Sequence, residues 1–146
     1  MFKKVYKTAS VGLLFLTSAA ISGVEIGGTR LVYNGNASQA AISINNPDSK
    51  PYLIQSWVSK SENDDDDDNI FTTTPPLFKL NPHAQNSVRV MLTGDTLPTD
   101  RESVYWLNIK AIPSSSPDAK NELLIAVKSK MKLFYRPAGL KGDPSL

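Results

Sequence analysis

The chain lacks cysteine altogether and has a single histidine among its 146 residues. The absence of cysteine excludes a disulfide framework, a cysteine-ligated zinc site and a thiol nucleophile. The one histidine, His83, lies in the polar run Asn81–Asn86, which is typical of an exposed turn. A Ser-His-Asp triad would have to use this residue, and a lone surface histidine rarely has such a role. The sequence therefore favours a protein that is not an enzyme and that needs neither a metal nor a cofactor.

A large excess of charge of one sign is also missing, because 16 basic and 14 acidic residues leave a formal net charge of +2. Binding to nucleic acid requires a concentrated basic surface that displaces counterions, so we expect no nucleic-acid partner. The composition is 40% hydrophobic and 21% charged, which is ordinary for a globular protein and excludes global disorder. The length fits one domain or one domain with an appendage.

A hydrophobic run long enough to cross a bilayer is the third absence. The first seven residues contain three lysines, an apolar run follows from Val11 to Ala20, and small residues stand at Ala20 and Ser22. This is the layout of a secretory signal peptide. A membrane anchor would need about 20 apolar residues. We predict a signal peptide over residues 1–22, cleaved after Ser22 with Ala20 as the alternative, and a mature protein outside the cytoplasm that is not inserted in a membrane.

From Val24 onward, apolar and polar residues alternate with period two, and turn residues interrupt the alternation. The expected strands are 28–33, 40–44, 52–58, 71–74, 77–80, 87–92, 103–109 and 123–135. Seven to eight short strands without helical periodicity predict an all-β fold, an immunoglobulin-like β-sandwich. Trp57 and Trp106 fall on these strands, and we expect both in the core.

The acidic run Asp64–Asp68 interrupts the strand pattern. Five adjacent carboxylates repel one another, and the run lacks the glycine and the spaced ligands of a calcium loop. We therefore predict a solvated hairpin tip that does not pack against the rest of the domain. Weak, unspecific cation binding is the alternative interpretation.

Six short strings, taken in order, carry a resemblance to a known family. They are Gly28–Arg30, Tyr52–Val58, Thr74–Leu80, Leu97–Ser103, Ile112–Pro113 and Lys132–Pro137. Their order and spacing resemble the N-terminal domain of the PapD-like periplasmic pilus (fimbrial) assembly chaperones, over about residues 28–140. The resemblance implies an immunoglobulin-like chaperone domain at 23–137. Residues 138–146 look like a linker stub toward a second domain that is absent, so the activity is expected to be impaired by truncation.

The resemblance implies a chaperone of fimbrial subunits in the periplasm, with the outer-membrane usher as a second partner in pilus biogenesis. In this family the subunit lacks the last strand of its fold, and the chaperone supplies one of its own strands by donor-strand complementation. Carried onto this sequence, the roles fall on seven residues. They are Arg30 and Lys132, which would hold the C-terminal carboxylate of the subunit; Leu123, Ile125 and Val127, the donated side chains; and Glu102 and Arg136, polar positions where the two domains of the family meet.

The residues themselves support only part of this assignment. Leu123, Ile125 and Val127 share one face of a strand and could fill a partner's core. The same alternation is equally expected of a strand that packs in the core of its own domain. Lys128 and Lys130 lie on the same phase as Lys132, so spacing alone does not single out the anchor.

Three other functions remain as alternatives. A secreted immunoglobulin-like adhesive or ligand-binding module would use the loops around Asp64–Asp68. A pilus subunit would commonly carry a cysteine pair, which this chain lacks, and the string at Lys132–Pro137 also argues against it. A hydrolytic enzyme would depend on His83.

Overall fold

The computed structural model describes residues 23–94, 97–115, 117–118 and 120–140. The predicted signal peptide and residues 141–146 of the expected linker stub lie outside this part of the chain. Its regular structure consists of nine strands. None of the described residues forms a helix that could cross a membrane.

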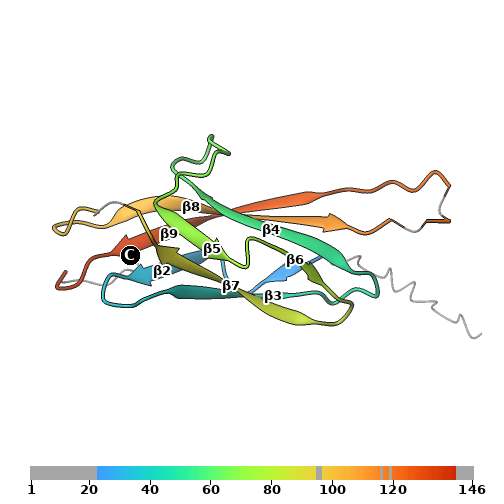
Figure 1. The fold of residues 1–146 in the computed structure, drawn as a ribbon, viewed down its shortest axis with the longest axis horizontal. Coiled ribbons are helices and arrows are strands. Elements are labelled where there is room, and N and C mark those ends of the chain that lie inside the picture. Colours follow the sequence, from blue (N-terminus) through green and yellow to red (C-terminus); the bar gives the residue numbers. More distant parts are fainter. Residues whose placement is uncertain (1–22, 95–96, 116, 119, 141–146) are drawn as a thin grey trace, which may run out of the picture.

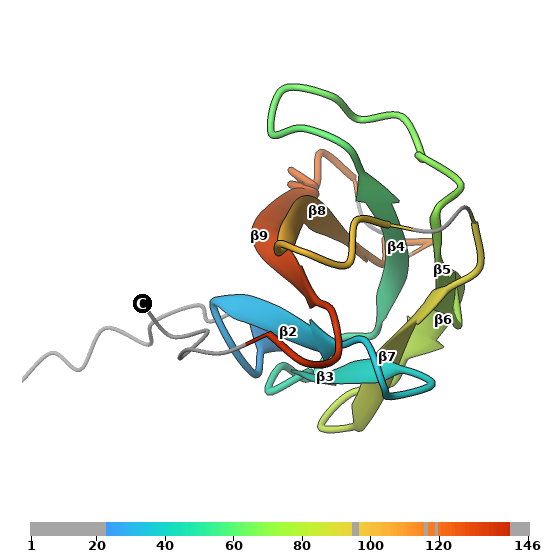
Figure 2. The same cartoon turned by 90° about the vertical axis from the view of Figure 1, so that its left-hand side faces the viewer.

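The strands build two sheets that face each other, as Figures 1 and 2 show. The four-stranded sheet has the order β1 (Glu25–Ile26), β3 (Ala40–Asn45), β7 (Gln85–Leu92), β5 (Phe71–Thr74). The five-stranded sheet has the order β2 (Arg30–Asn34), β9 (Val127–Arg136), β8 (Ser103–Pro113), β4 (Tyr52–Ser59), β6 (Leu77–Leu80). The pairing of β2 with β9 is parallel, whereas the other pairings are antiparallel. The predicted all-β immunoglobulin-like sandwich is confirmed.

Alternation in the sequence becomes burial in the structure because successive side chains of a strand point to opposite faces. Ile42 and Ile44 of β3 and Val88 and Val90 of β7 face the core with at most 5% of their surface exposed. At one end of the core an aromatic cluster surrounds Phe71. The ring centroids of its neighbours Tyr105, Tyr33 and Tyr135 lie 5.1, 5.9 and 6.3 Å away.

Several strand boundaries differ from the expectation by one to four residues, and one strand was not expected at all. The short β1 was not predicted, because two residues carry too little alternation to be recognised. The last strand begins at Val127 instead of Leu123, since its ladder with β8 starts at the pair Ala111 and Val127. Residues 121–126 precede this ladder, and an alternating sequence alone does not provide a pairing partner.

The prediction that both tryptophans lie in the core is wrong. Trp57 and Trp106 are half-buried and occupy the outer face of the five-stranded sheet, next to the inward-facing Val58 and Leu107. The alternation predicts which residues share a face, but it does not predict that the outer face carries large aromatic side chains. Trp106 lies under the ammonium group of Lys132, which is 5.8 Å from the ring centroid.

We predict that Phe71→Ala lowers the free energy of unfolding by about 3–5 kcal/mol, because it leaves a cavity among three tyrosines. Phe71 is 1% exposed, whereas Val104 on the outer face of β8 is 45% exposed and serves as the control. Val104→Ala should change the free energy of unfolding by no more than ~0.5 kcal/mol. Urea denaturation followed by circular dichroism measures both. Equal effects of the two substitutions would contradict this description of the core.

Candidate functional site

The candidate site lies along β9, whose two edges are paired to different extents. One edge pairs with β8 from Val127 to Tyr135, whereas the other pairs with β2 only from Lys132 to Arg136. Between residues 127 and 131, no described strand pairs with this second edge. An unpaired row of backbone N–H and C=O groups can accept a strand from another chain. We call residues 127–131 on this side the free edge of β9.

The residues that lead into the free edge are apolar and exposed. The exposed fractions are 82% for Leu123, 62% for Ile125 and 56% for Val127. The sequence left open whether these side chains pack in the core of their own domain, and their exposure excludes this. Figure 1 shows the segment between β8 and β9, in orange, extending beyond the other strands at one end of the sandwich.

An apolar hollow of about 380 Å³ adjoins this segment. Val24 and Ile26 line it from the N-terminal side, and Ile125 and Val127 line it from the start of β9. Apolar surface at the end of a sandwich, beside an unpaired edge, can accept side chains of an added strand.

The basic pair stands where the free edge ends. Arg30 is the first residue of β2 and lies in register with Lys132 on β9. Both side chains are exposed and share the outer face, since the next residues along the strands, Leu31 and Leu133, are buried. Within the described residues, neither Arg30 nor Lys132 has a carboxylate partner or a side-chain hydrogen bond. A strand added along the free edge would meet the start of β2, with its end beside two cations.

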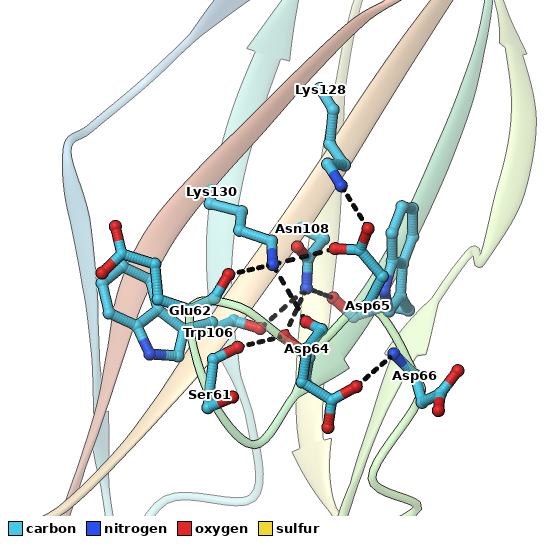
Figure 3. A network of polar contacts seen from close by, with 11 residues as sticks. Ser61, Glu62, Asp64, Asp65, Asp66, Trp106, Asn108, Lys128 and Lys130 are labelled. Carbon is cyan, nitrogen blue, oxygen red and sulfur yellow. Dashed lines mark hydrogen bonds and ion pairs between the residues drawn. The ribbon is translucent and has the colours of Figure 1, made fainter.

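The acidic run folds back over the outer face of β9, so the prediction of a tip that does not pack is wrong. Figure 3 shows Asp65 between two lysines: its Oδ2 is 2.6 Å from Nζ of Lys128, and its Oδ1 is 2.9 Å from Nζ of Lys130. The hydrogen bond from Lys128, together with that from Lys130, lowers the pKa of Asp65 to about 2. Opposite charge on a neighbouring strand thus overcomes the mutual repulsion of the aspartates.

Other carboxylates of the run bind the backbone of their own loop. Oδ1 of Asp68 accepts hydrogen bonds from the N–H groups of Ile70 and Phe71 at 3.0 and 3.4 Å, and burial raises the pKa of this carboxyl. Oδ1 of Asp64 accepts one from the N–H of Asp66 at 3.0 Å. In the part of the chain that the structure describes, no group of acidic or histidine side chains is arranged to hold a metal ion.

Glu102 and Arg136, which the resemblance assigns to the boundary between two domains, lie together near the end of β9. Nη1 of Arg136 donates to Oε1 of Glu102 at 2.6 Å, and Nη2 donates to the carbonyl of Leu140 at 3.1 Å. Their side chains are 14% and 29% exposed. These residues therefore form an ion pair with each other, which the sequence analysis did not predict.

His83 lies in an exposed turn between β6 and β7, as the sequence predicts. Its backbone has φ of 56°, in the left-handed region, and its N–H donates to the carbonyl of Asp48 at 3.3 Å. Histidine adopts the left-handed backbone conformation more readily than most residues do, which accounts for a histidine at this turn position.

Sequence reasoning missed two features of this site, the free edge and Asp65. The free edge depends on where β2 begins to pair with β9, which no local pattern encodes. Asp65 contacts lysines more than sixty residues away in the chain. The sequence does contain an acidic run, Asp64–Asp68, and lysines at alternate positions of the last strand. These two patterns do not predict which carboxylate contacts which lysine.

The sequence and the fold are similar to those of known proteins. Residues 23–141 match the family described as "Pili and flagellar-assembly chaperone, PapD N-terminal domain". Chaperone protein LpfB of Salmonella typhimurium is 47% identical over 139 residues, covering 93% of this chain and 59% of LpfB. Chaperone protein FimC of Escherichia coli is 40% identical over 135 residues, covering 90% of this chain and 55% of FimC.

A solved structure of the Salmonella enterica SafA pilin in complex with the SafB chaperone contains a similar chain, with a TM-score of 0.74 and 34% identity. The similarity covers 87% of this chain and 60% of that one. The chain thus spans less than two thirds of the length of these relatives. The match nevertheless extends over all nine strands and the basic pair. The chain belongs to the PapD N-terminal domain family of pili and flagellar-assembly chaperones.

Proposed function

We propose that the protein is a periplasmic, non-enzymatic chaperone that stabilises fimbrial subunits by donating β9 as a missing strand. One observation carries the proposal: the free edge of β9 is preceded by exposed apolar side chains and ends at Arg30 and Lys132. The predicted signal peptide supports the location. The similarity to relatives named probable fimbrial chaperones, and to a chain in a complex of a chaperone with a pilin, supports the class of partner.

The energetics favour strand donation from this segment. Burying a large aliphatic side chain contributes about 1.5–3 kcal/mol, so three of them supply roughly 5–9 kcal/mol before the cost of ordering. This contribution is available to a partner because Leu123, Ile125 and Val127 are mostly exposed in the free domain. Hydrogen bonds along the free edge would then fix the added strand.

The basic pair gives the added strand an end point. A terminal carboxylate beside Arg30 and Lys132 accepts charge-assisted hydrogen bonds, each worth about 1.5–3 kcal/mol. We assign this pair to the C-terminal carboxylate of the subunit, and we assign the subsequent hand-over to the outer-membrane usher, which the family resemblance implies. Glu102 and Arg136 would brace the end of β9 near the position where the family places its second domain.

The decisive experiment is periplasmic co-expression of the chain with a fimbrial subunit encoded nearby, followed by pull-down. Recovery of soluble subunit with the wild type, and its loss with Lys132→Ala, is the result expected. If the wild-type chain is folded and exported but recovers no subunit, the proposal is wrong for this chain.

We predict that Lys132→Ala and Arg30→Ala each weaken binding of a subunit's C-terminal peptide about ten- to hundredfold. The reason is the loss of one charge-assisted hydrogen bond to the carboxylate. Fluorescence anisotropy with a labelled free-acid peptide measures the dissociation constant. Lys79→Ala removes an exposed lysine from β6, at the far edge of the same sheet, and should leave the affinity unchanged. Unfolding of either variant at the basic pair would count against the assignment.

We predict that Ile125→Asp reduces subunit recovery severely while changing the free energy of unfolding by no more than about 0.5 kcal/mol. Ile125 is 62% exposed, so the substitution places no charge in the core of the domain. Leu124→Asp is the matched control, because Leu124 is adjacent, 44% exposed and on the opposite phase. Pull-down and urea denaturation are compared for both variants. Equal loss of subunit with the two substitutions would exclude a donor face at Ile125.

A further inference from the structure

The outer face of β9 presents three lysines at every second residue: Lys128, Lys130 and Lys132. Successive residues on one face of a strand lie roughly 7 Å apart. A partner strand that slips by one such repeat keeps its side chains on the correct faces. The alternation of the donor segment therefore allows three registers, in which the C-terminal carboxylate of the added strand lies beside Lys132, Lys130 or Lys128.

The backbone blocks slippage in one direction only. Beyond Lys132 the edge of β9 is occupied by β2, which begins at Arg30. In the opposite direction, toward Lys130 and Lys128, this edge has no partner among the described strands. Steric exclusion by β2 thus prevents an added strand from extending past Lys132. A different interaction must prevent the strand from ending earlier, beside Lys130 or Lys128.

Asp65 forms an ion pair with each of the two competing lysines, Lys128 and Lys130, as Figure 3 shows. Each of its carboxylate oxygens binds one ammonium group, at 2.6 Å for Lys128 and 2.9 Å for Lys130. Lys130 also donates to the carbonyl oxygens of Asp64, at 2.9 Å, and of Glu62. An ammonium group has three donor protons, so these contacts leave Lys130 none for a second carboxylate.

The loop that carries Asp65 is held at both ends. At its start, Nδ2 of the fully buried Asn108 donates to Oγ of Ser59 at 3.0 Å, and that hydroxyl donates to the carbonyl of Ser61. At its other end, the N–H of Asp68 donates to the carbonyl of Val58 at 3.1 Å. These bonds keep Asp65 over β9 without any contact to Arg30 or Lys132.

We propose that Asp65 is a specificity residue that masks Lys128 and Lys130, so that Arg30 and Lys132 alone receive the subunit's terminal carboxylate and the donated strand has one register. This inference rests on the proposed function and adds the selection of register to it. Asp65 acts through the lysines and does not touch the partner. Its loss should therefore change where the subunit strand ends more than how stably the domain folds.

The test measures register directly by disulfide cross-linking. Because the chain has no cysteine, Ala126→Cys introduces a single thiol on the exposed approach to the free edge. The probes are synthetic peptides of a fimbrial subunit's C-terminal strand with a free carboxylate, each with one cysteine at a different position. Near-ultraviolet circular dichroism verifies that every variant is folded.

In the otherwise wild-type chain, one peptide position should dominate the cross-links. Asp65→Asn should add cross-links shifted by one repeat, two residues closer to the peptide's C-terminus. Asp66→Asn is the matched control, because its carboxylate makes no ion pair with the described residues, and it should keep the single register. Adding Lys128→Gln and Lys130→Gln to Asp65→Asn should restore the single register.

A rescue experiment gives a result that misfolding cannot imitate. Lys132→Ala removes the anchor, and Asp65→Asn in the same chain frees Lys130 as a substitute. The double variant should regain peptide binding lost in Lys132→Ala, with its cross-links shifted by two residues. Should Asp65→Asn fail to fold, Asp65→Ser replaces it, since the Asp65 side chain is 58% exposed and fills no core volume.

The outcomes separate the inference from the proposed function. A single unchanged register in folded Asp65→Asn, together with no rescue, overturns the inference while the function stands. Failure of the wild-type chain to bind any free-acid peptide overturns the proposed function and the inference with it.

Discussion

The candidate site depends on the length over which β2 pairs with β9. The two strands pair in parallel from Arg30 and Lys132 onward, and β2 does not extend past the earlier residues of β9. This single offset leaves a backbone edge open at 127–131 and places a basic pair where the edge ends. Unpaired backbone groups, exposed apolar side chains and a basic pair therefore follow one another along the same strand.

The rest of the domain supports β9 along its other edge and from below. β8 pairs with β9 along nearly its whole length, and the aromatic cluster around Phe71 packs beneath the half of β9 that includes Tyr135. An exposed strand edge is ordinarily a risk of aggregation. Here the outer face of the same strand is covered by an acidic loop whose Asp65 forms ion pairs with two lysines. The domain thus exposes the edge and the basic pair while Asp65 covers the two neighbouring lysines.

Much of the fold was predictable because a sandwich buries one face of each strand. The strands at 71–74 and 77–80 were predicted with their observed bounds, and Ile42 and Ile44 alternate in the sequence as they do in the core. The tryptophans were misplaced because a half-covered outer face also accepts large aromatic side chains. The start of the last strand was misplaced because pairing with β8, and not composition, decides where a strand begins.

The sequence by itself determined the sandwich and, through six short strings, the family and the candidate site residues. It also determined the phase that Leu123, Ile125 and Val127 share, because alternation is a local property of the chain. Only the tertiary structure decided that these side chains are exposed, that Arg30 and Lys132 are neighbours and that Asp65 binds the other two lysines. These facts depend on contacts between segments far apart in the chain, which local patterns do not encode.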